Sequence, residues 1–240
     1  MIREKFLREI HRIEADLLSM GHVVQNALGE AVKALLKRDF TKSREIIAND
    51  ALVNQRQHDI EMACLRLIAT QQPMARDLRS LATVIAISSE LERMHDYAKG
   101  IGKINVLLSQ EPLMDQVSDL PIMATKAQDM LHRAMICFAR RDVVLARTIP
   151  IDDDEVDALY NKIYHEVFTS AMEDMRWMTQ ANYILWAAHN IERTADRVTN
   201  ICERVVFVVT GKLVEISDDN FAWGEEIFLP SPPVPVGSMK

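Results

Sequence analysis

The sequence predicts an all-α protein, and three observations point to that fold class. The 240 residues include only 7 glycines and 8 prolines, and four of those prolines lie after residue 229, so the body of the chain is poor in turn formers. Ala, Leu, Met, Glu, Arg and Lys, which favour helices, are plentiful. Apolar residues also recur at alternating intervals of three and four positions. That spacing is typical of a helix face that packs in a bundle.

The first half of the chain is predicted to form three helices, covering 3–37, 41–71 and 74–109. An apolar seam over positions 6–34 supports the first helix. Thr41 is a suitable N-cap for the second. Pro73 then interrupts the pattern, and the third helix is expected to start behind it, because proline is tolerated in a first helical turn. Proline and serine residues mark a connector at 110–121.

The same pattern starts again after the connector, which indicates an internal duplication. The aligned segments are 20–34 with 123–137 and 37–39 with 140–142 at a shift of 103, and 91–96 with 191–196 at a shift of 100. A seam, a turn and an acidic motif that recur in register are typical of a repeat protein. We therefore predict a tandem repeat of two three-helix bundles, over 1–110 and 119–212. An irregular, Pro-rich tail is expected at 217–240.

The composition of the chain excludes some classes of function. The net charge is −7, from 35 acidic and 28 basic residues, which argues against non-specific binding of nucleic acid because phosphates require a basic face. Three cysteines lie far apart and are expected to be core residues in a reducing compartment. The first residues lack the apolar stretch of a signal peptide, and no apolar run approaches the ~20 residues that span a bilayer. We expect a cytoplasmic protein.

Acidic residues four positions apart occur at equivalent places in both repeats. In the first repeat they are Asp50 with Asn54 and Glu92 with Asp96; in the second they are Asp153 with Asp157 and Glu192 with Asp196. Side chains four apart share one face of a helix. If the second and third helices of a repeat pack antiparallel, the two pairs face each other.

Such a cluster of carboxylates predicts a cation site. Oxygen ligands without paired thiols or imidazoles suit hard metals such as iron, manganese, magnesium or calcium. The second repeat is expected to bind more strongly, because Asn54 replaces a carboxylate in the first. A solvated acidic surface remains the alternative, since a lone Glu-x-x-x-Asp is far more often a surface pair. The nearby histidines are interpreted as polar surface residues: His58, His95, His165 and His189.

Four segments together resemble the PhoU family of phosphate-signalling regulators. They are Gln-Pro-Met-Ala-Arg-Asp-Leu-Arg at 72–79, Leu-Glu-Arg-x-x-Asp at 91–96, Asp-Asp-x-Val-Asp-x-Leu-Tyr at 153–160 and Ile-Glu-Arg-x-x-Asp-x-x-x-Asn-Ile at 191–201. The resemblance covers positions 1–212 and leaves out the tail.

The resemblance implies two three-helix bundles with iron or other metal clusters, multinuclear ones included, on their acidic pairs. The implied ligands are Asp50, Glu92, Asp96, Asp153, Asp157, Glu192 and Asp196; Asn54 departs from the acidic pattern. The implied function is negative regulation of phosphate uptake and of the phosphate-starvation response. The implied partners are the components of a phosphate ABC transporter and a membrane sensor histidine kinase. We also expect a homodimer without catalytic activity, peripheral to the inner membrane at most.

Two other hypotheses about the function stay open. A ferritin-like di-iron enzyme requires Glu-x-x-His on two helices and a further glutamate from each of two others. Glu92-x-x-His95 supplies one such motif, but Ala195 stands at the matching place in the second repeat. The other alternative is a metal-free helical scaffold with solvated acidic faces.

Overall fold

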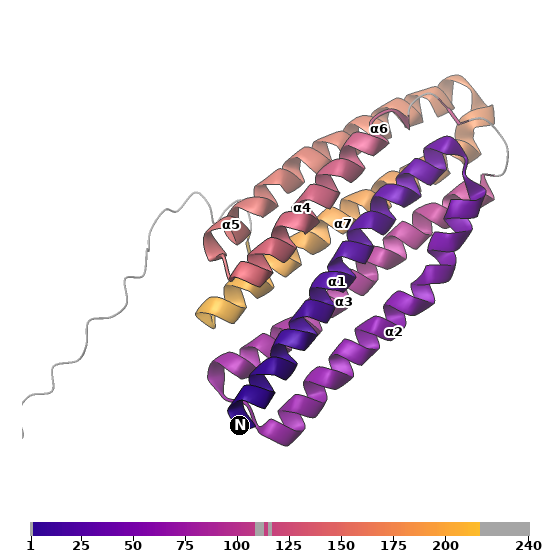
Figure 1. Cartoon of the computed structure of the whole chain (residues 1–240). Helices are drawn as coiled ribbons and strands as arrows, with labels where there is room; N and C mark the ends of the chain where they lie inside the picture. Colours follow the sequence, from indigo (N-terminus) through magenta and orange to yellow (C-terminus); the bar gives the residue numbers. More distant parts are fainter. Residues whose placement is uncertain (1, 109–112, 115–116, 217–240) are drawn as a thin grey trace, which may run out of the picture.

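The computed structural model describes residues 2–108, 113–114 and 117–216. Those residues are helical with short turns, and no β-strand occurs among them. Figure 1 shows long helices running side by side in two antiparallel groups. The first group comprises α1 (Ile2–Lys37), α2 (Phe40–Gln71) and α3 (Ala75–Leu107). The second comprises α4 (Leu120–Arg140), α5 (Val143–Thr148), the 3₁₀ turn η2 (Ile149–Asp152), α6 (Asp153–Glu173), the 3₁₀ turn η3 (Met175–Trp177) and α7 (Met178–Thr210).

The helices of the first half agree with the predicted ranges to within a few residues. The end of the third predicted helix at 109, part of the connector (110–112 and 115–116) and the tail at 217–240 lie outside the described residues. One detail of the prediction is wrong: Asp39, not Thr41, caps α2, because its side chain accepts a hydrogen bond from the backbone N–H of Lys42. An aspartate at the cap position satisfies an N–H that has no partner inside the helix.

The turn that follows the first helix has the same conformation in both halves. Arg38 and Arg141 each adopt a positive φ, of 55° and 57°. The next residue, Asp39 or Asp142, then caps the following helix through its side chain. Sequence segments aligned at a shift of 103 therefore fold alike, which confirms the tandem duplication at the level of the backbone.

The second helix of the repeat differs between the halves. α2 is continuous, whereas its counterpart is divided into α5, η2 and α6. Pro150 stands at the break and aligns with Ile47, which lies in the second turn of α2. A proline in a helix interior removes a hydrogen bond and clashes with the preceding turn, so the chain passes through a 3₁₀ turn before α6 begins.

One hydrophobic core joins the two halves. α3 packs against α1, α2 and α7, while α7 packs against α3, α4 and α6. The predicted seam of α1 is buried from Phe6 to Ala34, and all three cysteines are buried and free, as expected of core residues. In the part of the chain that the structure describes, no helix is long and apolar enough to cross a membrane.

Candidate functional site

The four carboxylates predicted in the second repeat lie close enough to repel one another. Asp153 and Asp157 stand on α6, and Glu192 and Asp196 face them from α7; we call this group the second acidic site. Burial first, and then the charges of Asp196, Asp157 and Glu192, raise the pKa of Asp153 to about 7. Burial and the charge of Asp196 likewise raise the pKa values of Asp157 and Glu192. The packing of α6 on α7 thus concentrates negative charge.

Nearby cations compensate the second acidic site only in part. Arg193 bonds to Asp196 over 3.1 Å, and His189 Nδ1 lies 3.1 Å from Glu192 Oε2 without hydrogen-bond geometry. Asp153 Oδ1 and Glu192 Oε2 are buried oxygens that receive no hydrogen bond from the described residues. A buried carboxylate oxygen without a donor is costly. These are the oxygens that a cation would satisfy.

The corresponding group in the first repeat contains a cation of its own. This first acidic site consists of Asp50 and Asn54 on α2 with Glu92 and Asp96 on α3. The ammonium of Lys99 lies 2.6 Å from Asp50 Oδ2 and 2.7 Å from Asp96 Oδ1. It therefore bonds a carboxylate of α2 to one of α3. Such charge-assisted hydrogen bonds are stronger than bonds between neutral groups.

Both carboxylate oxygens of Asp50 accept hydrogen bonds from neighbouring side chains. The residue is only 8% exposed, and its Oδ1 lies 3.2 Å from Nδ1 of His95, which donates because a carboxylate accepts. The amide of Asn54 approaches Oδ2 at 3.5 Å. Burial alone would raise the pKa of Asp50, but the hydrogen bonds from Lys99 and His95 outweigh burial and lower it. Glu92 differs, since burial and then the charges of Asp96 and Asp50 raise its pKa.

Two residues that contact Asp50 in the first acidic site were missed by the sequence reasoning. His95 was interpreted as a polar surface residue, which is wrong, because it is 1% exposed and contacts Asp50. Its position four residues after the buried Leu91 was the available signal. Lys99 was not considered; its place three residues after Asp96 on a helix indicated an ion pair. His58, His165 and His189 are exposed, as expected.

The two sites therefore suit a metal ion unequally. The second acidic site offers four carboxylates and two buried oxygens without donors, which is the chemistry that a hard cation requires. The first acidic site already contains the ammonium of Lys99, which pairs with two of its three carboxylates. Within the described residues, no three side chains of His, Cys, Asp or Glu are arranged as a ready coordination shell. A metal at the second acidic site would accordingly need its carboxylates to close in.

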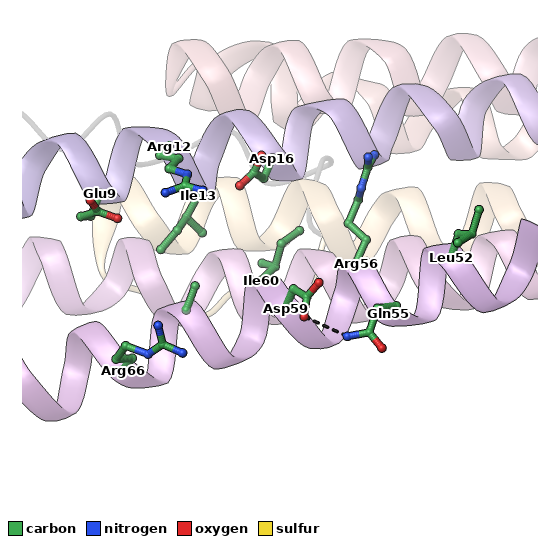
Figure 2. Close-up of a pocket in the computed structure, with 11 residues that line it drawn as sticks. Glu9, Arg12, Ile13, Asp16, Leu52, Gln55, Arg56, Asp59, Ile60 and Arg66 are labelled. Atoms are coloured by element: carbon green, nitrogen blue, oxygen red, sulfur yellow. Dashed lines mark hydrogen bonds between the residues drawn. The ribbon is translucent and has the colours of Figure 1, made fainter.

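A groove between α1 and α2 lies apart from these residues. It encloses about 580 Å³ and is lined by Glu9, Arg12, Ile13, Asp16, Leu52, Gln55, Arg56, Asp59, Ile60, Ala63 and Arg66. Figure 2 shows charged side chains entering it from both helices, with Arg56 extending from α2 toward α1 and Gln55 bonded to Asp59. None of the eight predicted site residues belongs to this lining.

Comparison with known proteins identifies the two halves. The PhoU domain matches residues 17–104 and again residues 120–205. The phosphate-specific transport system accessory protein PhoU homolog of Clostridium acetobutylicum is 32% identical over 219 residues, which cover 91% of this chain and all of that protein.

Two crystal structures share the fold. The phosphate transport system regulatory protein PhoU from Streptococcus pneumoniae superposes with a TM-score of 0.80 at 32% identity, covering 87% of this chain and 99% of its own. PhoU from Pseudomonas aeruginosa gives a TM-score of 0.82 at 30% identity, covering 86% and 100%. With two domain matches and relatives aligned over most of their length, the chain belongs to the PhoU family.

Proposed function

We propose that this chain is a regulatory accessory protein of a phosphate transport system, acting as a negative regulator of phosphate uptake and of the phosphate-starvation response. Family membership across both repeats carries the proposal, together with relatives that are named for that role. The protein works by docking, and it has no catalytic reaction of its own. The tightly packed cysteines and the absence of a nucleophile with an adjacent base among the motifs support that view.

The finer proposal is that of a metal-binding adaptor. Asp153, Asp157, Glu192 and Asp196 would hold iron or another hard cation, which supplies positive charge and joins α6 to α7. The observation that supports it is the pair of buried carboxylate oxygens, on Asp153 and Glu192, that lack donors. Removal of the mutual repulsion would favour a single arrangement of the two helices and a defined docking face.

The proposed partners are the components of a phosphate ABC transporter and a sensor histidine kinase, met at the cytoplasmic side of the inner membrane by a homodimer of this chain. A strain that lacks the gene tests the regulatory role. We expect faster uptake of radiolabelled phosphate and expression of a phosphate-starvation reporter even in phosphate-rich medium. Unchanged uptake and an unchanged reporter would disprove the proposed function.

A complementation experiment tests the acidic face. The variant Asp157→Asn, Glu192→Gln, Asp196→Asn removes three charges from the second acidic site, and we expect it to restore repression poorly. The matched control is Glu9→Gln, Asp16→Asn, Asp59→Asn, which removes three charges from the α1–α2 groove and should restore repression like the wild type. Equal repression by both variants would favour the metal-free scaffold.

A further inference from the structure

The two acidic sites differ at three aligned positions, and all three differences concern positive charge or ligand oxygen. At a shift of 100, Lys99 aligns with Thr199 and His95 with Ala195; at a shift of 103, Asn54 aligns with Asp157. The first repeat thus has a lysine and a histidine where the second has short, uncharged side chains. Thr199 Oγ1 is buried and has no hydrogen-bond partner among the described residues, so it bonds to none of the nearby acids.

Lys99 occupies the position between the carboxylates of α2 and α3. Its Nζ lies 2.6 Å from Asp50 Oδ2 and 2.7 Å from Asp96 Oδ1. Hard metals bind carboxylate oxygens at about 2.0–2.6 Å, so a metal that bridged these two oxygens would need the same space. It would also place a dication beside an ammonium, which is strongly unfavourable in a partly buried site.

The remaining groups of the first site reinforce this arrangement. His95 is buried against Asp50 Oδ1, and the amide nitrogen of Asn54 faces Asp50 Oδ2. Both oxygens of Asp50 therefore already accept hydrogen bonds, three of them in all. Lys99 itself is 22% exposed in its side chain, and the side chain of Asp50 is 11% exposed. Little solvent is available to screen their attraction.

We propose that Lys99 is a built-in counter-ion that takes the place of a metal in the first repeat, so that this chain binds metal at the second repeat alone. The inference rests on the proposed metal binding of the second acidic site. It also assigns different roles to the two repeats. In the first repeat, α2 and α3 are joined by an ammonium group that is part of the protein. Only the second repeat responds to the supply of metal.

A gain-of-binding experiment tests the proposal in a variant whose second acidic site has lost the carboxylates needed to bind metal. The background variant Asp157→Asn, Asp196→Asn is dialysed against MnCl₂ and its bound manganese is measured by elemental analysis; we expect none. Adding Lys99→Thr, His95→Ala and Asn54→Asp copies the second repeat into the first. We expect this variant to gain bound Mn²⁺, and its melting temperature to rise on addition of Mn²⁺. No gain in either measurement would overturn the proposal.

Two further variants of the wild type complete the test. Glu92→Gln, Asp96→Asn should retain all the Mn²⁺ that the wild type binds, and a loss of Mn²⁺ would overturn the proposal. Thr199→Lys should bind at least about tenfold less Mn²⁺ than the wild type, because it supplies an ammonium to the second site. Circular dichroism confirms that each variant stays helical, and Lys99→Gln, a smaller change, replaces Lys99→Thr if the combined variant unfolds.

The outcomes separate this inference from the proposed function. If the wild type binds no Mn²⁺ and the copied first site gains it, the metal-binding adaptor fails while the role of Lys99 stands. If the wild type binds Mn²⁺ in a way that depends on Asp157 and the copied first site gains none, the adaptor stands and the role of Lys99 fails.

Discussion

Asp50 and Asp153 are equivalent residues of the two repeats with opposite electrostatic surroundings. The pKa of Asp50 is lowered by Lys99 and His95 against the effect of burial, whereas burial and four neighbouring acids raise the pKa of Asp153 to about 7. Desolvation disfavours the charged form in both cases, so the difference comes from the partners. A lysine and a histidine, present in one repeat and absent from the other, together decide the sign.

Asp153 should make the metal-free protein less stable as the pH rises. Its ordinary pKa is 3.8 and its pKa in the fold is about 7, so between these values the folded chain binds more protons than the unfolded chain. The free energy of unfolding therefore falls as pH rises through that window. Asp153→Asn should flatten the dependence and stabilise the metal-free protein near pH 7 by about 1–2 kcal/mol, after discounting for partial exposure.

Urea unfolding of both proteins at about pH 5 and about pH 7.5, with metal removed, measures this effect. Exposed Glu173, at the other end of α6, provides the control Glu173→Gln, which should leave the slope unchanged. Parallel pH profiles for the wild type and Asp153→Asn would contradict the prediction.

Lys99 should stabilise the fold through Asp50. Lys99→Met keeps the length of the side chain and removes the ammonium, which leaves the buried carboxylate of Asp50 without its shortest hydrogen bond. We expect a loss of about 1–3 kcal/mol in the free energy of unfolding. Lys103, an exposed residue four positions later on α3, supplies the control Lys103→Met. Equal stability of the two variants would show that Lys99 is an ordinary surface lysine.

At the scale of the helices, the spacing of apolar residues and the residues that start or end helices predicted the elements well. Both signals are local in sequence. The seam of α1 and the restart at Pro73 needed no knowledge of the rest of the chain. The acidic pairs were predictable for the same reason. Burial of His95 and the pairing of Lys99 with Asp96 had local signals, but the contacts of both residues with Asp50 had none, because Asp50 lies 45 and 49 residues away. Pro150 was also a local signal, since a proline in a helix interior predicts the break between α5 and α6.

The equivalent caps Asp39 and Asp142 should contribute equally. Each accepts a backbone N–H, from Lys42 over 2.9 Å and from Leu145 over 3.0 Å. Replacing either by alanine leaves that N–H without its partner and should cost about 1 kcal/mol. Thermal unfolding of the two single variants and the double variant measures the costs, which should add because the sites are separate. Replacement by Asn, which also caps, should cost less than alanine in both cases.

At the scale of the whole molecule, the two repeats share a core rather than standing as independent bundles. Polar contacts accompany the packing of α3 on α7 and of α1 on α4. Arg197 on α7 pairs with Glu90 on α3 over 3.4 Å, and Gln128 donates to the backbone oxygen of Gln25 over 2.7 Å. The duplication was visible in the sequence, but this junction was not. It joins residues more than 100 positions apart, and although Gln25 and Gln128 are equivalent at the shift of 103, a repeat in the sequence does not tell which helices of its two copies pack together.

A shared core predicts that a destabilising substitution in one repeat also lowers the stability of the other. Leu17 is fully buried in α1, and Leu17→Ala should cost about 2–5 kcal/mol. The three tryptophans all lie in the second half of the sequence, and in a Trp223→Phe background the fluorescence reports on Trp177 and Trp186 alone. If the halves unfold as one unit, Leu17→Ala must shift the fluorescence midpoint in urea as far as the midpoint measured by circular dichroism. Leu52→Ala, at a position 70% exposed on α2, should leave both midpoints in place. A fluorescence midpoint that stays fixed while the helical signal is lost in two steps would mean that the repeats unfold separately, because the core of the first would then not support the second.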